Sequence, residues 1–243
     1  MPKLIARTAT LSEVQKDLIY GTLLGDGHIG SSSVAFYAAG QGHLQQDYLL
    51  HKYDILKNIT KMKPYLNKCA ITDYMSYKFS TLTNNNLLGL RKIFYLHDAT
   101  GALVKGLDGK VIKIVPPNIS ELINARGLAY WFMDDGCADQ YGYKFATNSF
   151  DKKSLDYIVD MLKNKFNLPD VTLQKHGLGN ITGLPEYKIY IGAKSREKFR
   201  ALVEPYMLDT LKYKLEITGR HGKKIVKTAI DVINENNIIR KKL

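Results

Sequence analysis

The sequence predicts an α+β protein made of two related halves. Shifting the 243-residue chain by 109 positions lays Asp26 and Gly27 on Asp135 and Gly136, and Phe36 on Phe145. Around each Asp-Gly pair the elements follow in one order: an apolar helix, alternating sequence typical of a strand, then an amphipathic helix. With 45% hydrophobic residues and 7 prolines, the chain has enough apolar surface to form a folded core.

The first helix begins at a capping box, in which Ser12 and Gln15 satisfy each other's backbone N–H groups. We expect it to run to about residue 24. One stripe along it is formed by Val14, Leu18, Gly21 and Gly25. The matching helix, residues 125–134, is apolar nearly all round, which indicates burial. The two helices are therefore expected to pack on each other, with small residues allowing close approach.

The remaining elements follow from alternation and amphipathic spacing. Strands are predicted over residues 33–37, 70–80, 141–147, 171–175 and 186–191. Helices are predicted over residues 44–59, 86–96, 154–166 and 195–202. A connector rich in Gly and Lys, residues 101–110, and two prolines at 116–117 divide the chain into an N-terminal half, 1–112, and a C-terminal half, 113–243, with a polar, basic tail at 234–243.

The charge balance indicates the class of partner. Lys plus Arg number 35 against 23 Asp plus Glu, a net charge of +12, with a pI near 9.4. A polyanion is expected to bind, nucleic acid first and an anionic membrane surface second. Neither a membrane-spanning stretch nor a signal-peptide core is visible, so a soluble protein with no membrane partner is expected. Cys69 and Cys137 lack the spacing of a zinc site or disulfide framework and are predicted to be buried thiols.

Each apolar helix ends in a carboxylate, Asp26 or Asp135. The carboxyl end of a helix already carries about half a negative charge, so an acid there is poorly placed. If the helices pair, the two carboxylates meet, and divalent cations would relieve their repulsion. Mg²⁺ prefers hard oxygen ligands, water and phosphate. This arrangement resembles a metal-dependent phosphodiesterase, in which metal activates water and stabilises the leaving oxygen.

The alternative for the Asp-Gly pairs is that they only end helices, because glycine accepts a positive φ there without steric cost. One copy would favour that interpretation. Two copies at matching places in a basic chain favour a functional site.

The segments at residues 19–27, IYGTLLGDG, and 128–136, LAYWFMDDG, resemble the two LAGLIDADG motifs of a single-chain homing endonuclease. The second is most similar to the intron-encoded, two-motif branch of that family, and the resemblance covers nearly the whole chain. It implies a monomeric, saddle-shaped pair of αββαββα units with the motif helices at the pseudo-dyad. It also implies four-stranded sheets over the major groove of double-stranded DNA, and a double-strand break with short 3′ overhangs that promotes intron mobility.

The resemblance also implies roles for the motif residues. The last acid of each motif maps onto Asp26 and Asp135, which would bind the divalent ions, Mg²⁺ or another cation such as Mn²⁺, and carry catalysis. The preceding residues, Gly25 and Asp134, would offer backbone carbonyls to the metal. Asp134 is itself a departure, since it stands where the first motif has glycine.

A basic residue is expected near each catalytic centre, to polarise the water network or stabilise the charge of the pentavalent phosphorane. Local matching to the family indicates Lys113 and Lys214. Lys105 is a rival because it lies 109 positions before Lys214. A second departure from the motif concerns helix packing, since Tyr130 stands where the first motif has Gly21.

Strand residues with amide, cationic or phenolic side chains are candidates for contact with bases and phosphates. They are Tyr77, Lys78, Lys144, Asn148, Gln174, Lys175, Lys188 and Tyr190. The six histidines lack metal-binding spacing and are assigned no catalytic role.

Two other functions remain open at this point. Members of this family also act as RNA maturases, which would make host intron RNA a partner. A transcription factor on the same scaffold is the third possibility, and it would need neither acidic turn. Abundant Lys, Asn, Ile and Tyr indicate A·T-rich coding, which is compatible with an intron of a mitochondrion or chloroplast.

Overall fold

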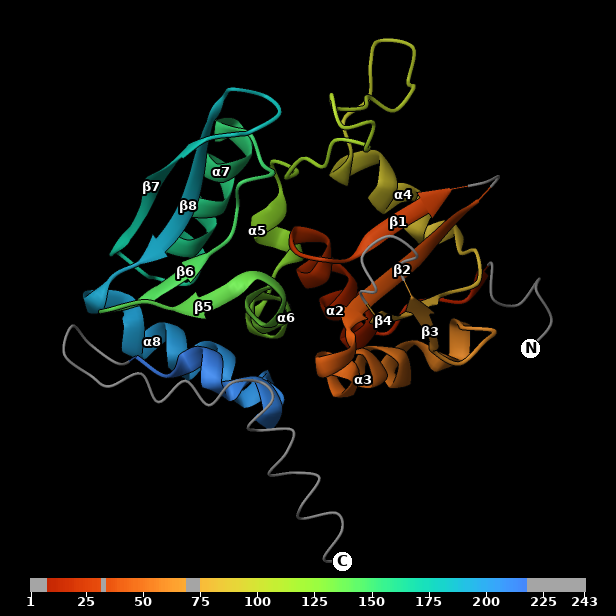
Figure 1. Ribbon diagram of the computed structural model, residues 1–243, viewed down its shortest axis with the longest axis horizontal. Coiled ribbons are helices and arrows are strands. Elements are labelled where there is room, and N and C mark those ends of the chain that lie inside the picture. The colour runs from red at the N-terminus through yellow and green to blue at the C-terminus, as the bar shows by residue number, and fades with distance from the viewer. Residues whose placement is uncertain (1–7, 32–33, 69–74, 218–243) are drawn as a thin grey trace, which may run out of the picture.

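A central pair of helices, α2 (Glu13–Leu24) and α6 (Ala125–Asp135), joins two similar halves (Figure 1). This computed structural model describes residues 8–31, 34–68 and 75–217. A four-stranded antiparallel sheet flanks the helix pair on each side. The two-half organisation expected from the repeat is confirmed, and the fold is α+β.

The N-terminal half continues from α2 through two hairpins, each followed by a helix. Its elements are β1 (His28–Ser31), β2 (Ala35–Gly42), α3 (Gln46–Leu56), β3 (Tyr65–Lys68), β4 (Met75–Ser80) and α4 (Asn85–Phe94), with short 3-10 turns at His43–Gln45 and Lys57–Ile59. The strand order is β1-β2-β4-β3. An arm formed by isolated bridges, such as His97 with Leu103 and Lys105 with Val111, connects the halves.

The C-terminal half repeats this order after a short helix, α5 (Ile119–Leu122). Its elements are β5 (Gly136–Ala138), β6 (Tyr143–Phe145), α7 (Lys152–Asp160), a π-helical turn at Met161–Lys165, β7 (Val171–Leu178), β8 (Pro185–Ile191) and α8 (Ala193–Val203), then 3-10 segments at Glu204–Tyr206 and Asp209–Leu215. The strand order, β5-β6-β8-β7, matches that of the first sheet. Each half is therefore an αββαββα unit.

Most predicted elements are confirmed, including the capping box at Ser12 and Gln15. The sequence missed α5 and three short strands, β1, β3 and β5, because three or four residues cannot show an alternating pattern. Part of the strand predicted at 70–80 and the tail at 234–243 lie outside the described residues.

Close packing of α2 against α6 is confirmed. A Cβ atom added at Gly21 would lie 2.1 Å from the Gly127 carbonyl oxygen, so only glycine fits there. Buried Asp17 of α2 anchors the opposite end of the interface, where it accepts hydrogen bonds from Asn124 Nδ2 at 2.7 Å and from Arg126 Nη1 at 3.1 Å. The close contact at Gly21 and the hydrogen bonds of Asp17 together set the distance between the helices.

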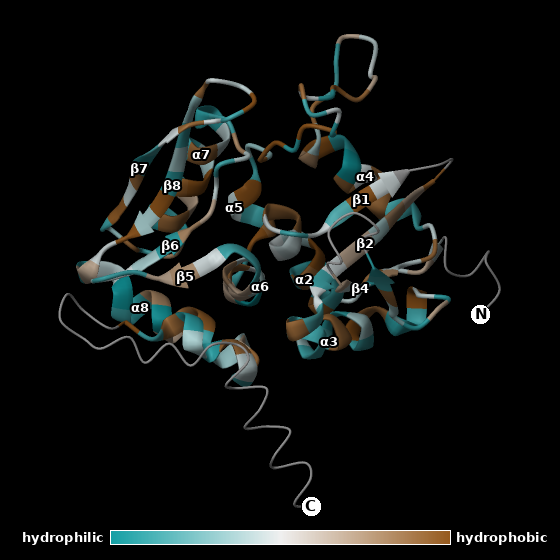
Figure 2. Ribbon diagram, viewed as in Figure 1, coloured by the Kyte–Doolittle hydropathy of each residue, from teal (hydrophilic) through white to brown (hydrophobic). Residues whose placement is uncertain are grey.

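The core lies between each sheet and its helices. Teal and brown alternate along α3, α7 and α8 in Figure 2, as expected for helices with one exposed and one buried face. Beneath the second sheet, Phe132, Phe145 and Phe199 make edge-to-face ring contacts with centroids 5.1 to 5.8 Å apart. Among the described helices, none is long and apolar enough to cross a membrane.

One side-chain prediction is wrong, and one correspondence of the repeat does not hold in the structure. Phe145 is fully buried, but Phe36 lies on the outer face of its sheet, over Gly30. The repeat therefore slips within the first hairpin, and a one-residue slip in a strand turns a side chain to the other face. Cys137 is exposed rather than buried, because it projects from the outer face of β5 opposite Lys144. Cys69 lies outside the described residues.

The glycines after the two acids do not use a positive φ. Gly136 has φ −86° and ψ 152°, and Gly27 is likewise not among the glycines with positive φ. Space is the constraint instead, since a Cβ atom at Gly136 would lie 2.0 Å from Phe132 Cδ2 and one at Gly27 would lie 2.7 Å from Thr22 Oγ1. The interpretation of Asp-Gly as a simple left-handed helix stop is wrong.

Candidate active site

Asp26 and Asp135 lie at the carboxyl ends of the paired motif helices. Gly25 caps α2 by donating its N–H to the Thr22 carbonyl at 3.0 Å, which brings Asp26 just beyond the helix end. Asp135 is the last residue of α6. Burial, followed by the negative charges of Asp26 and Asp134, raises the pKa of the Asp135 carboxyl to about 7. The two predicted catalytic carboxylates are therefore close enough to influence each other.

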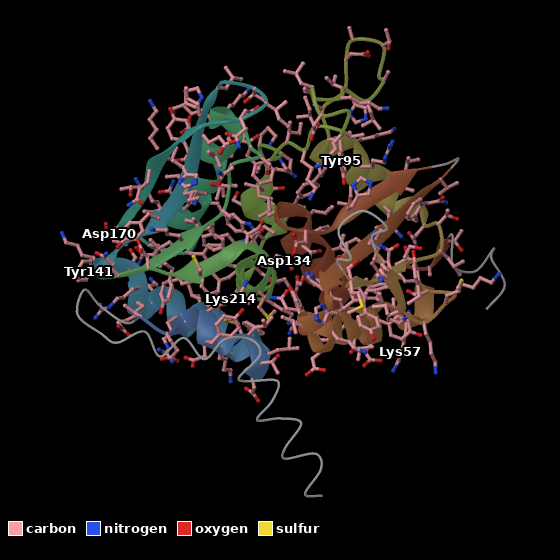
Figure 3. The ribbon with its side chains drawn as sticks, in the orientation of Figure 1. Lys57, Tyr95, Asp134, Tyr141, Asp170 and Lys214 are labelled. Atoms are coloured by element: carbon pink, nitrogen blue, oxygen red, sulfur yellow. The ribbon has the colours of Figure 1, made fainter. Side chains whose placement is uncertain are left out.

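A third carboxylate, Asp134, lies at the junction of the two halves (Figure 3). Its side chain is fully buried and pairs with the equally buried Lys52, with Nζ 2.7 Å from Oδ1. Its Oδ2 accepts the backbone N–H of Asp26 at 3.0 Å. Burial raises the pKa of Asp134, and the Lys52 ammonium opposes that shift. The Asp134 side chain thus faces the protein interior.

Lys113 and Lys214 occupy matching places beside the two motifs. Lys113 Nζ donates to the carbonyls of Gly25 and Gly27, both at 2.7 Å. Lys214 Nζ donates to the carbonyls of Met133 at 2.5 Å and Asp134 at 3.0 Å. Burial lowers the pKa of both ammonium groups, and the carboxylates of Asp134, Asp135 and Asp26 oppose this. The rival Lys105 lies exposed on the connecting arm.

The oxygen atoms at this junction fit a hard divalent cation. Asp26 and Asp135 supply carboxylates, the ligand type that Mg²⁺ prefers. The carbonyls of Gly25 and Asp134, expected to help, already accept a hydrogen bond from a lysine, although a carbonyl oxygen retains a second lone pair. In the described ranges, no cluster of three or more His, Cys, Asp and Glu side chains is arranged to hold a metal ion.

Known proteins share both the sequence and the fold. The model of the LAGLIDADG DNA endonuclease family matches residues 16–199. The chain belongs to this LAGLIDADG family. It is 32% identical over 219 residues to "DNA endonuclease I-ChuI" of Chlamydomonas applanata, covering 85% of this chain and 96% of that protein.

Two further relatives of the LAGLIDADG chain are informative. It is 29% identical to "Cytochrome b mRNA maturase bI2" of Saccharomyces cerevisiae, which covers 82% of this chain but only 46% of the maturase. The solved structure of "the homing endonuclease I-WcaI bound to its DNA recognition sequence" has a TM-score of 0.69 and 24% identity, and the match covers 86% of this chain and 88% of that one. The resemblance seen in the two motifs is confirmed.

The outer sheet faces of this LAGLIDADG protein carry most of the predicted DNA-contacting side chains. Strand register places Lys78, Lys144, Gln174, Lys188 and Tyr190 on the outer faces. Lys144 also pairs with Asp139 at 2.7 Å. Asn148 lies beyond β6 and donates to Glu186 Oε2 at 2.6 Å.

Two of the eight candidates lie on the inner faces of their sheets. Tyr77 is opposite Gln41 in the register and packs against the core. Lys175 is opposite Tyr187, on the same side as the partly buried Leu173 and the buried Ile189. Residue type alone does not give the phase of a strand, and the phase decides which face a side chain occupies.

Sequence reasoning missed Gln41 and Lys52. Gln41, at the end of β2, is 6% exposed and donates from Nε2 to Asp26 Oδ2 at 3.1 Å. Nothing in the local pattern distinguishes it from a surface amide. Lys52 did leave a signal, because it lies four residues after Tyr48 and four before Leu56, on the apolar stripe of α3. A lysine in that position needs a buried acid.

Proposed function

We propose that this protein is a site-specific endonuclease that makes a metal-dependent double-strand break in a long, asymmetric DNA target, leaving short 3′ overhangs and promoting intron mobility. The observation that carries the proposal is the duplicated site, in which Asp26 and Asp135 lie at the carboxyl ends of two paired helices and each motif is contacted by its own partly buried lysine. Two strands require two cuts, and the repeat supplies two similar sets of groups.

The duplex would lie along the outer faces of both sheets. Lysines such as Lys78 and Lys188 would contact phosphates and provide affinity, while Gln174 and Tyr190 offer groups for base edges. Because the two faces carry different side chains, the two half-sites would differ in sequence. A single chain with two halves supports activity as a monomer.

Asp26 and Asp135 would hold the divalent cation, Mg²⁺ or Mn²⁺, with help from the carbonyls of Gly25 and Asp134. Such a cation, when bound, activates water and stabilises the leaving oxygen. Lys113 and Lys214 are held at the motif carbonyls, where their charge would stabilise the phosphorane that forms during in-line attack. Burial lowers the pKa of both lysines, and an arriving phosphate would raise it again.

The experiment uses a plasmid carrying the joined exons that flank the gene, since their junction should spell the target. Asp26→Asn and Asp135→Asn are each expected to lower double-strand cutting with Mg²⁺ by about 10³-fold or more, while binding measured in Ca²⁺ is retained. Asp156→Asn is the matched control because Asp156 is a half-exposed acid of α7 that pairs with Lys152 on the same helix. Full cutting by either motif variant would refute the two-carboxylate mechanism.

A maturase that assists splicing of its host intron RNA is the second candidate. The similarity to the bI2 maturase favours it, although this chain spans less than half of that protein. A splicing assay with the host intron separates the two activities. Asp26→Asn should abolish DNA cutting and leave splicing intact if both activities are present.

The gene's own location is part of the proposal. We place the protein in a mitochondrion or chloroplast, synthesised there from an intron. Finding the reading frame in nuclear DNA without a surrounding intron would contradict this.

A further inference from the structure

The buried pair of Lys52 and Asp134 has no role in the mechanism described so far. Both side chains are fully inaccessible to solvent, and burying two charges is costly unless their geometry is good. Lys52 also lies 4.0 Å from the centre of the Tyr48 ring, and the Tyr48 hydroxyl donates to the Tyr130 carbonyl at 3.2 Å. The pair therefore ties α3 to the end of α6.

The Asp134 carboxylate is directed at the first catalytic aspartate. Its Oδ2 accepts the Asp26 N–H at 3.0 Å, while its Oδ1 lies 3.5 Å from Gln41 Nε2. The same Gln41 nitrogen donates to Asp26 Oδ2 at 3.1 Å. Asp26 is thus held at its backbone by Asp134 and at its carboxylate by Gln41.

Within the described residues, this arrangement occurs once. The residue that matches Asp134 in the first motif is Gly25, and a Cβ atom there would lie 2.6 Å from Asp134 Cβ. One side chain therefore fills the space at the pseudo-dyad that two would otherwise share. On the buried face of the matching helix α7 and its π-helical extension, Ile158 and Met161 are apolar where α3 has Lys52.

We propose that Lys52 and Asp134 are positioning residues for Asp26 and make the two catalytic centres unequal. Lys52 neutralises the Asp134 carboxylate, so that its free oxygen can hold the Asp26 backbone without adding an uncompensated charge beside the metal ligands. Losing the acceptor oxygen of residue 134 should then slow the strand cut that depends on Asp26 more than the other cut. The inference rests on the proposed endonuclease function.

The test compares two double variants of equal charge, Lys52→Met/Asp134→Asn and Lys52→Met/Asp134→Ala. Replacing a buried ion pair by neutral groups is often tolerated, so both are expected to fold. Asn keeps an acceptor for the Asp26 N–H and Ala does not. Cleavage of the two strands is followed separately on end-labelled exon-junction DNA with Mg²⁺, beside thermal unfolding and DNA binding in Ca²⁺.

The Ala variant should cut one strand about 10- to 100-fold more slowly than the Asn variant, the usual effect of removing a partner of a metal ligand. The other strand should change less than about threefold, so nicked DNA accumulates. A loss of stability alone would slow both strands together. Gln41→Ala leaves the ion pair in place and should slow the same strand cut as the Ala variant. It keeps the test available if a double variant does not fold.

An unchanged ratio of the two strand rates in all three variants would overturn the inference while leaving the endonuclease function intact. Failure of the wild-type protein to cut either strand would overturn the proposed function, and the inference with it.

Discussion

Gly21→Ala tests whether contact between the motif helices controls both stability and catalysis. The added Cβ would lie 2.1 Å from the Gly127 carbonyl oxygen, against about 3.5 Å for an ordinary contact, so the helices must separate by more than ~1 Å. Overpacking of this kind costs about 3 kcal/mol at its upper end, and alanine in a helix returns up to ~1 kcal/mol. We expect a net loss of about 2 kcal/mol in the free energy of unfolding.

The same shift moves Asp26 relative to Asp135. A displacement of about 1 Å at reacting groups costs roughly 10²-fold in rate, so cutting should fall by that factor in protein that is still folded. Urea unfolding and strand cleavage are measured on Gly21→Ala and on Gly89→Ala. Gly89 is exposed on α4 and has open space at its Cβ position, so its alanine variant should gain ~0.5–1 kcal/mol and keep full activity. Equal stability of the two variants would refute the reasoning.

Three other outcomes follow from the structure. Lys188→Ala should weaken DNA binding and reduce the slope of log affinity against log salt by about 1. Lys175 lies on the inner face, so Lys175→Ala should leave that slope unchanged. Equal slopes for the two variants would contradict the proposed DNA face. Lys113→Ala and Lys214→Ala should each lower the cleavage rate more than DNA affinity, and unchanged turnover in both would exclude these lysines. Burial lowers the pKa of His51, which contacts the Tyr130 hydroxyl at 2.9 Å, so the folded state binds fewer protons than the unfolded state. The free energy of unfolding should therefore fall as the pH drops below about 6.5. Thermal unfolding of His51→Gln should depend less on pH over that range, and parallel curves for the two proteins would exclude this role.

The sequence predicts those features of the fold that recur in both halves or follow a regular spacing of apolar residues. The paired helices, the capping box of α2 and the acid at the end of each motif could be found because each leaves a pattern within about a dozen residues. Strand phase could not be found in this way, so the sequence does not show that Tyr77 and Lys175 lie on the inner faces of their sheets. The partnership of Lys52 with Asp134 spans 82 positions, so only the fold reveals why a lysine interrupts the apolar stripe of α3.

The charges at the junction explain how a strongly basic protein can still need a cation. Three acids and three lysines meet there, and their formal charges cancel: Asp26, Asp134, Asp135, Lys52, Lys113 and Lys214. The net charge of +12 therefore comes from residues outside the junction, where it can attract a duplex but cannot neutralise the site. Because Lys52 is committed to Asp134, two acids face two lysines, and an incoming phosphate tips the balance negative. In the proposed mechanism, a divalent cation held by Asp26 and Asp135 would offset that negative charge, which links the buried ion pair to the proposed metal site.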